Sequence, residues 1–111
     1  FGLIFENLCI RDLRVYAESI NGNVYHFRDA SDLECDAVIH LRNGLYGLIE
    51  IKLGGDNLIN EGAENLKKMY SKIDTKKMKN PSFLMVLTAT GKYAYKREDG
   101  VLVVPVGCLK N

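Results

Sequence analysis

The sequence predicts an α/β domain in which helices cover a mixed sheet, and three observations lead to this prediction. Residues 3–18 and 56–73 place apolar side chains at helical spacing. Asn43-Gly44 lies between two alternating segments, a pattern typical of an antiparallel hairpin. The second helix separates that hairpin from the apolar run 83–87, and such a crossover makes the strands on either side of it parallel.

The chain has the size and composition of one globular domain. Its 111 residues fall in the usual single-domain range, and we expect one domain over residues 1–111. The 15 Lys and Arg against 14 Asp and Glu give a formal net charge of +1, which excludes a strongly basic nucleic-acid arm and an acidic disordered tail. Because the sequence does not begin with Met, we expect a fragment of a longer chain.

No apolar run approaches the ~20 residues that a membrane span needs, and no secretion signal begins the chain. The three cysteines, Cys9, Cys35 and Cys108, are far apart, odd in number and set among apolar residues. This pattern favours reduced thiols in the core over a disulfide or a zinc site. We therefore expect a cytoplasmic protein that does not contact a membrane.

The first half of the chain is expected to form one helix and three strands. No Gly or Pro interrupts the helical pattern of 3–18, and Asn21-Gly22-Asn23 marks a turn before a strand at 24–28. Residues 29–32 are a second turn, because Asp and Ser side chains bond to their own backbone in turns. An alternating strand follows at 33–41.

The hairpin around Asn43-Gly44 pairs strand 33–41 with strand 46–53. Successive side chains of a strand point to opposite faces of the sheet. The two faces of the first strand are expected to carry Cys35, Ala37, Ile39 and Leu41, and Glu34, Asp36, Val38 and His40. Those of the returning strand are expected to carry Ile49, Ile51 and Leu53, and Leu48, Glu50 and Lys52.

The second helix follows Gly54-Gly55, with Asp56 as its expected N-cap and an end near Ile73. Small residues on its apolar stripe let it lie close to the sheet. The stripe consists of Ile59, Gly62, Ala63, Leu66, Met69, Tyr70 and Ile73.

The end of the chain is expected to add a strand and a small hairpin. A basic connector at 76–81 leads into the apolar strand 83–87. Segments 93–96 and 101–106 form the terminal hairpin, in which Pro105 belongs at an edge or a strand end. The predicted order is therefore helix, three strands, helix, strand and hairpin.

Three charged side chains of the central hairpin form the candidate site. Glu50 and Lys52 are two residues apart, so they project from one face. The turn at Asn43-Gly44 sets Asp36 opposite a residue near Glu50 or Lys52, with the register open by one or two residues. Carboxylates are the ligands of hard cations such as Mg²⁺ or Mn²⁺. A neighbouring ammonium can hold an attacking water and offset the charge on a phosphate. The set predicts metal-assisted hydrolysis of phosphodiesters.

A purely structural interpretation of the same residues stands beside this one. Glu-x-Lys spacings arise by chance in a chain with 26% charged residues, and we interpret the comparable Asp74-Thr75-Lys76 as surface charge. Cross-strand Glu and Lys pairs also stabilise exposed sheets. In that case the acids and the lysine form a salt-bridge ladder that binds no metal.

Glu6 extends the candidate site if its side chain points inward. A carboxylate on an apolar helix face is costly unless it is paired or bound to a metal. Alternatively, Glu6 faces solvent beside Asn7 as a first-turn acid that the helix dipole favours. The apolar residues on its face of the helix are Leu3, Cys9, Ile10, Leu13 and Ala17.

Four segments, taken in order, carry a family resemblance. They are Gly2-Leu3-Ile4-Phe5-Glu6-Asn7, His26-Phe27-Arg28-Asp29, Leu33-Glu34-Cys35-Asp36 and Leu48-Ile49-Glu50-Ile51-Lys52. They resemble the uncharacterised C-terminal domain of a family of bacterial and archaeal AAA-type ATPases, in which Val is typical at the positions of Cys35 and Ile51. The order of elements resembles the αβββαβ core of PD-(D/E)XK nucleases, a restriction-endonuclease-like fold.

The resemblance implies roles for five residues. Asp36 and Glu50 would be metal ligands, with the Ile51 carbonyl as a third, and Lys52 would orient the attacking water. Glu6 would bind a second ion or a water on the first. The implied cofactor is Mg²⁺ or Mn²⁺, and the implied partners are DNA and the ATPase portion of the parent chain. The chain contains no Gly-x-x-x-x-Gly-Lys-Ser/Thr loop, so we expect no ATP site in it.

Our first hypothesis is therefore a magnesium-dependent nuclease domain, and the alternative is a catalytically silent nuclease-like module that binds nucleic acid or protein. His26 and His40 are expected to be structural or surface residues, and no sequence signal indicates an oligomeric state. Two basic stretches could meet DNA phosphates, although a solvated surface is the commoner explanation. They consist of Lys67, Lys68, Lys72, Lys76, Lys77 and Lys79, and of Lys92, Lys96 and Arg97.

Overall fold

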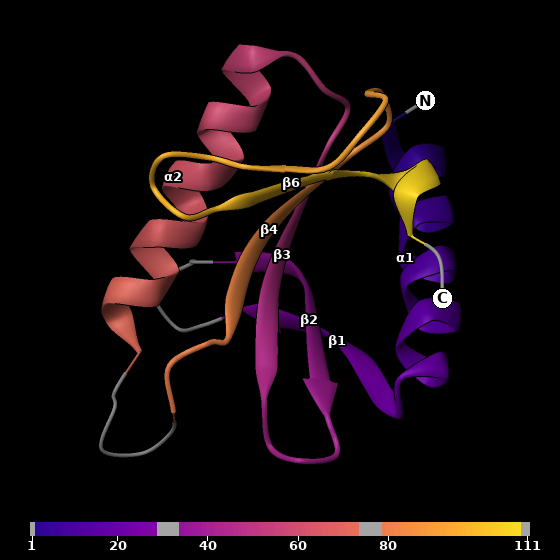
Figure 1. Cartoon of the computed structure of the whole chain (residues 1–111), viewed down its shortest axis with the longest axis vertical. Coiled ribbons are helices and arrows are strands. Elements are labelled where there is room, and N and C mark those ends of the chain that lie inside the picture. The colour runs from indigo at the N-terminus through magenta and orange to yellow at the C-terminus, as the bar shows by residue number, and fades with distance from the viewer. Residues whose placement is uncertain (1, 29–33, 74–78, 110–111) are drawn as a thin grey trace.

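The computed structural model describes residues 2–28, 34–73 and 79–109, and it confirms the predicted α/β class (Figure 1). Its elements are α1 (Gly2–Ser19), β1 (Gly22–Arg28), β2 (Glu34–Leu41), β3 (Tyr46–Lys52), α2 (Asp56–Lys72), β4 (Phe83–Thr88), β5 (Tyr95–Lys96), β6 (Leu102–Pro105) and a 3-10 turn (Val106–Cys108). The described strands form one six-stranded sheet in the order β1-β2-β3-β4-β6-β5. Helices α1 and α2 cover its opposite faces.

The strand pairings follow the predicted connections. β1, β2 and β3 pair antiparallel, whereas β3 and β4 pair parallel because α2 carries the chain across the sheet between them. The turn after β2 forms at Asn43-Gly44, where the Leu45 amide donates to Asn43 Oδ1 at 3.1 Å and Gly44 has a φ of 89°. The terminal hairpin of β5 and β6 is confirmed, and Pro105 is the last residue of β6.

Each face of the sheet has its own apolar layer. On the α1 side the buried residues are Cys9, Leu13, Ala17, Ala37, Ile39, Ile49, Ile51 and Leu87. On the α2 side they are Cys35, Tyr46, Leu48, Ala63, Leu66, Met69, Val86 and Val101. The predicted alternation of β3 is confirmed, because Ile49 and Ile51 face α1 while Leu48 faces α2. Glu50 is the buried charged residue of β3, and Lys52 at the end of the strand is half-buried.

Helix α2 lies close to the sheet because its stripe contains a glycine at the point of contact. A Cβ on Gly62 would lie 3.2 Å from Val86 Cγ2 and 3.5 Å from Glu50 Cβ. The prediction of Asp56 as N-cap is wrong by one residue: Gly55 is the N-cap, with a φ of 91°, and Asp56 begins the helix. As a first-turn acid, Asp56 still interacts favourably with the helix dipole.

A bulge in β2 breaks the predicted alternation. The pairing of β1 with β2 shifts by one residue between Tyr25↔Val38 and Phe27↔Cys35. Cys35 consequently packs on the α2 side of the sheet, and its expected position beside Ala37 is wrong. The extra residue lies next to Asp36, where the candidate site begins.

The cysteines and the first turn differ from expectation in part. Cys9 and Cys35 are buried free thiols, as predicted, and burial raises their pKa values to about 11 and about 12. Cys108 is exposed, so its predicted place in the core is wrong.

Strand β1 already begins at Gly22, within the predicted turn. The turn at 29–32 and the first half of the connector at 76–81 lie outside the described residues. No described helix is long and apolar enough to cross a membrane.

The α2 layer can be tested with one leucine pair on a single helix. Leu66 is fully buried, whereas Leu58 is 37% exposed. We expect Leu66→Ala to lower the free energy of unfolding by about 2–5 kcal/mol, because it removes buried contacts and leaves a cavity. Leu58→Ala should cost less than about 1 kcal/mol. Urea denaturation of both variants measures the difference, and equal losses would contradict the packing described above.

Candidate functional site

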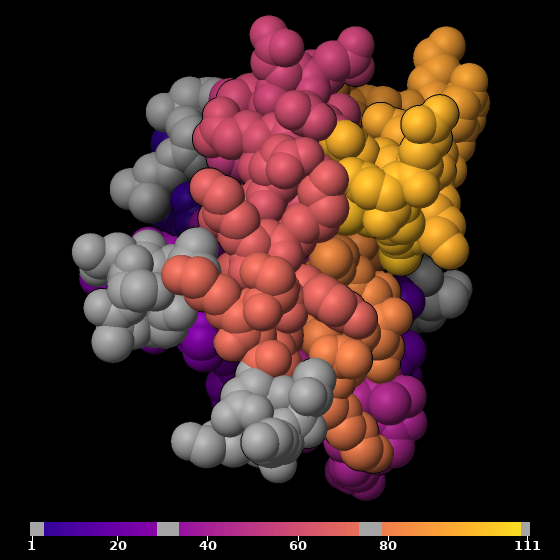
Figure 2. All heavy atoms as spheres, turned by 90° about the vertical axis from the view of Figure 1, so that its left-hand side faces the viewer, coloured from indigo at the N-terminus to yellow at the C-terminus, as the bar shows by residue number. Residues whose placement is uncertain are grey.

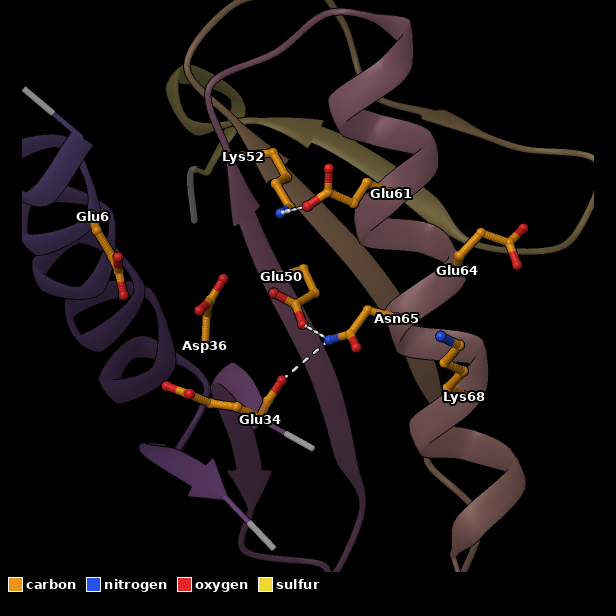
Figure 3. Close-up of a pocket in the computed structure, with 9 residues that line it drawn as sticks. All are labelled: Glu6, Glu34, Asp36, Glu50, Lys52, Glu61, Glu64, Asn65 and Lys68. Atoms are coloured by element: carbon orange, nitrogen blue, oxygen red, sulfur yellow. Dashed lines mark hydrogen bonds and ion pairs between the residues drawn. The ribbon is translucent and has the colours of Figure 1, made fainter. Parts of the chain in front are cut away.

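A cavity of about 520 Å³ opens where β2, β3 and α2 face the first turns of α1 (Figure 3). Its walls combine the sequence-predicted site residues with polar residues of α2. The lining residues are Glu6, Glu34, Asp36, Glu50, Lys52, Glu61, Glu64, Asn65 and Lys68.

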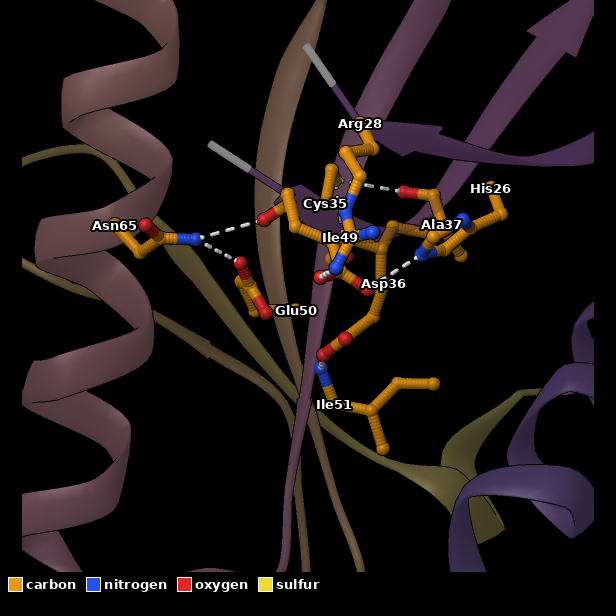
Figure 4. Close-up of polar contacts among 10 residues, drawn as sticks. His26, Arg28, Cys35, Asp36, Ala37, Ile49, Glu50, Ile51 and Asn65 are labelled. Atoms are coloured by element: carbon orange, nitrogen blue, oxygen red, sulfur yellow. Dashed lines mark hydrogen bonds and ion pairs between the residues drawn. The ribbon is translucent and has the colours of Figure 1, made fainter. Parts of the chain in front are cut away.

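The bulge in β2 places Asp36 against β3. Regular pairing between β2 and β3 ends at Ala37↔Ile49, and continuing that register by one residue sets Asp36 opposite Glu50. At this point the Ile51 amide donates to Asp36 Oδ2 at 2.8 Å, so a side-chain carboxylate takes the bond that a strand carbonyl would otherwise accept (Figure 4). This hydrogen bond ties Asp36 to the strand that carries Glu50 and Lys52.

Glu50 is the buried carboxyl group of the site. It is only 5% exposed, and it points toward α2, where Asn65 Nδ2 donates to its Oε1. The same Asn65 nitrogen donates to the Glu34 carbonyl oxygen at 3.1 Å. One amide group thereby joins α2 to β3 and to the start of β2.

Burial and the neighbouring acid change the protonation of Glu50. Desolvation, followed by the hydrogen bond and the charge of Asp36, raises the pKa of Glu50 to about 9, although Asn65 and Lys52 act in the opposite direction. Glu50 therefore keeps its proton at neutral pH in the metal-free protein, because burial and the neighbouring Asp36 disfavour its charged form. A bound cation would remove that penalty and release the proton.

Lys52 projects from the same face of β3 as Glu50, as predicted, and its ammonium group is paired. Lys52 Nζ lies 3.0 Å from Glu61 Oε1 on α2, and the lysine side chain is 22% exposed (Figure 3). The expected amine is thus at the rim of the cavity. Its partner comes from the helix rather than from the two strand acids.

Glu6 points from α1 toward the cavity and is half-buried, so its inward orientation is the one observed (Figure 3). It does not complete a cluster with the strand acids. Among the residues that the structure describes, no group of three or more His, Cys, Asp or Glu side chains has an arrangement that could hold a metal ion. Asp36 and Glu50 form a pair, and Glu6 stands on the wall that faces them.

The donor set suits one hard cation with few protein ligands. Mg²⁺ takes oxygen donors, commonly one or two carboxylates, and retains several waters. Asp36 and Glu50 provide two such carboxylates in mutual contact, and the Ile51 carbonyl is a further oxygen in the same strand segment. Thiolate or imidazole ligands, which Zn²⁺ prefers, do not line the described cavity.

Helix α2 contributes residues to this cavity that were not predicted from the sequence. Glu61, Glu64, Asn65 and Lys68 all line it, and they recur at helical spacing beside the apolar stripe of α2. A helical-wheel projection of α2 would have shown that these polar residues lie on one side of the helix, next to the stripe that packs on the strand of Glu50 and Lys52. With Glu34 included, the described lining carries six carboxyl groups and two ammonium groups, so the cavity is strongly acidic.

The predicted basic stretches are partly neutralised by acids of the same face. Figure 2 shows α2 running down this face with the β5–β6 hairpin beside it. Lys67 contacts Glu64 at 2.9 Å and Asp99 at 3.1 Å, and Arg97 contacts Asp99 at 3.4 Å. The Lys67–Asp99 pair joins the hairpin to α2. Lys76 and Lys77 lie outside the described residues.

The two histidines are surface residues, as predicted. His26 Nε2 lies 2.7 Å from Glu34 Oε1, and Arg28 reaches the other oxygen of Glu34 at 3.3 Å. His40 is exposed, and its ring meets the Tyr25 ring edge to face. Neither histidine lines the cavity.

The raised pKa of Glu50 predicts how stability depends on pH in metal-free protein. The folded state keeps a proton that the unfolded state releases between about pH 4.5 and 9, so stability is greatest below this window and falls as the pH rises through it. The slope has an upper limit of about 1.4 kcal/mol per pH unit. We expect Glu50→Gln to flatten the curve and Glu64→Gln to leave it unchanged.

Urea denaturation in EDTA at several pH values measures these slopes. Parallel curves for the unsubstituted protein and Glu50→Gln would show that the Asp36–Glu50 pair does not hold the extra proton.

Comparison with known proteins identifies a family. No curated protein and no solved structure matches the chain significantly. The sequence model described as "Domain of unknown function (DUF4143)" matches residues 1–109, which is nearly the whole chain. The predicted similarity to an uncharacterised domain is confirmed to that extent. The chain therefore belongs to the DUF4143 family.

Proposed function

We propose that this domain is a nuclease that hydrolyses phosphodiester bonds of DNA with the help of Mg²⁺ or Mn²⁺. The observation that carries the proposal is that Asp36 and the buried Glu50 line one acidic cavity beside Lys52, where Asp36 helps to raise the pKa of Glu50. A buried acid beside a second acid destabilises a protein unless the buried acid is protonated or a cation lies beside it. Such an arrangement is typical of a cation site rather than of a structural contact.

The polar contacts argue against a simple salt-bridge ladder. A ladder would pair the strand acids with the strand lysine. Instead Lys52 contacts Glu61, while Glu50 accepts from Asn65 and Asp36 accepts from the Ile51 amide. In these contacts, neither strand acid is hydrogen-bonded to a cationic side chain. This favours a cation from solution as the partner of the two acids.

Each residue of the chain has a defined task in this proposal. Asp36 and Glu50 would hold the cation, with the Ile51 carbonyl as a further donor. The cation would polarise a phosphate oxygen and make water a better nucleophile. Lys52 would exchange Glu61 for the substrate, orient the attacking water and offset the charge that develops on the phosphate. Glu6 would accept a hydrogen bond from water on the opposite wall.

The charge of the cavity makes the cation necessary for substrate binding as well. Six carboxyl groups against two ammonium groups in the described lining repel a phosphodiester at short range. Only a bound cation would reverse that potential at the scissile phosphate. Activity should therefore be absent in EDTA.

The cellular setting belongs to the same proposal. We propose that the domain acts beside an AAA-type ATPase, on the basis of the four sequence segments described above, and in the cytoplasm, on the basis of its cysteine pattern. The chain itself has no Gly-x-x-x-x-Gly-Lys-Ser/Thr loop, so nucleotide hydrolysis would be the task of another part of the assembly.

A second candidate is a catalytically silent module that binds nucleic acid or protein. It is favoured by the lack of a three-ligand group among the described residues and by the pairing of Lys52 with Glu61. This candidate has the same fold and the same cavity but no hydrolytic step.

Cleavage of DNA separates the two candidates. We expect the protein to nick or linearise plasmid DNA in Mg²⁺ or Mn²⁺. Asp36→Asn, Glu50→Gln and Lys52→Met should each reduce the rate on the order of 10²–10³-fold, because each removes a group that stabilises the transition state. Glu64→Gln, a cavity acid that contacts Lys67, should retain the rate.

Two outcomes would reject the nuclease. Cleavage that persists in Asp36→Asn would come from a contaminant. Calorimetric binding of Mg²⁺ with no cleavage of plasmid, linear or single-stranded DNA would favour the silent module.

A further inference from the structure

We infer that Asn65 is the positioning residue of the candidate site. It holds β2, which carries Asp36, and β3, which carries Glu50, in the arrangement that receives a cation. This inference rests on the proposed function and extends it to α2. The roles that the family resemblance implies fall only on residues of α1, β2 and β3, whereas Asn65 lies on α2.

The hydrogen bonds of Asn65 join the two parts of the site. Its Nδ2 donates both to the side-chain oxygen of Glu50 on β3 and to the main-chain oxygen of Glu34 at the start of β2 (Figures 3 and 4). Glu34 is two residues before Asp36. A single amide group thus fixes the position of one acid directly and of the other through its own strand.

This bridge replaces pairing that the sheet lacks. Cα pairing between β2 and β3 runs from His40↔Tyr46 only as far as Ala37↔Ile49, and the bulge follows. Residues 34–36 are therefore outside the β2–β3 ladder, although Glu34 and Cys35 still pair with β1. The Ile51–Asp36 hydrogen bond and the Asn65–Glu34 hydrogen bond hold this segment from two directions.

The chemistry of the amide determines its orientation. Both acceptors, a carboxylate oxygen and a carbonyl oxygen, require a donor, and an NH₂ group offers two protons. A rotated amide would place its oxygen against two oxygens. The short Asn side chain reaches Glu50 because Gly62, about one turn earlier, lets α2 approach β3 so closely that a Cβ at Gly62 would lie 3.5 Å from Glu50 Cβ.

An orienting hydrogen bond of this kind acts on the ligand rather than on the ion. Donation to Glu50 Oε1 fixes the rotamer of the carboxyl group and leaves Oε2 free to bind a cation. Loss of partners that orient ligands typically weakens metal affinity about 10- to 100-fold. Asn65 touches neither substrate nor ion in this arrangement, so its effect should appear in affinity before it appears in the chemical step.

The experiment compares Asn65→Leu with Asn57→Leu. Leu is similar in size to Asn but cannot donate, and Asn57 is an exposed residue of the same helix outside this cavity. Calorimetry with Mn²⁺ alone should show affinity about 10- to 100-fold weaker for Asn65→Leu and within twofold of the unsubstituted protein for Asn57→Leu. Asn65→Gln, which keeps the NH₂ group, should recover part of the loss. Asn65→Ala replaces the leucine variant if thermal melting in EDTA shows that the latter is unfolded.

Affinity for Mn²⁺ within twofold of the unsubstituted protein in a folded Asn65→Leu would overturn the inference. If the unsubstituted protein itself binds neither Mn²⁺ nor Mg²⁺, the proposed function fails. The positioning role is then decided by metal-free crystal structures: displacement of the Glu50 carboxyl group in Asn65→Leu supports it, and an unmoved carboxyl group overturns it.

Discussion

The hydrogen bond from the Ile51 amide to the Asp36 carboxylate is the contact on which the site depends. It forms because the bulge in β2 ends regular pairing with β3 at Ala37 and leaves a strand amide without a carbonyl partner. A buried amide needs an acceptor, and the aspartate provides one. The same local irregularity that interrupts the sheet therefore brings an acid from β2 beside an acid from β3.

Helix α2 turns this pair into an enclosed site. Gly62 allows the helix to pack directly over Glu50, and the apolar layer of Leu66, Ala63 and Val86 holds it there. Burial removes water from Glu50 while Asp36 remains in contact, and together they raise its pKa to about 9. The packed layer thus keeps Glu50 buried beside Asp36, where two negative charges are unfavourable and a proton on Glu50 stabilises the metal-free protein. A divalent cation would stabilise the site further, because it favours the charged form of both carboxylates.

Much of the fold could be predicted from periodicity and turn chemistry. The Asn43-Gly44 turn predicted that Asp36 lies near Glu50 or Lys52, and the stripe from Ile59 to Ile73 predicted α2 and the parallel crossover. The bulge was not predictable from the sequence. One extra residue moves Cys35 to the other face of the sheet, but the alternating pattern of residue types along the strand stays the same. Asn65 was missed because a polar residue beside an apolar stripe resembles ordinary helix surface.

The sequence by itself determined the element order, the mixed sheet and the common face of Glu50 and Lys52, since these follow from local spacing along one or two strands. Only the tertiary structure decided which partners those side chains have. Lys52 meets Glu61, Glu50 meets Asn65, and Glu6 faces the strand acids without joining them. These outcomes depend on where α1 and α2 dock on the two faces of the sheet. That docking is set by packing between residues distant in the chain, which no local pattern encodes.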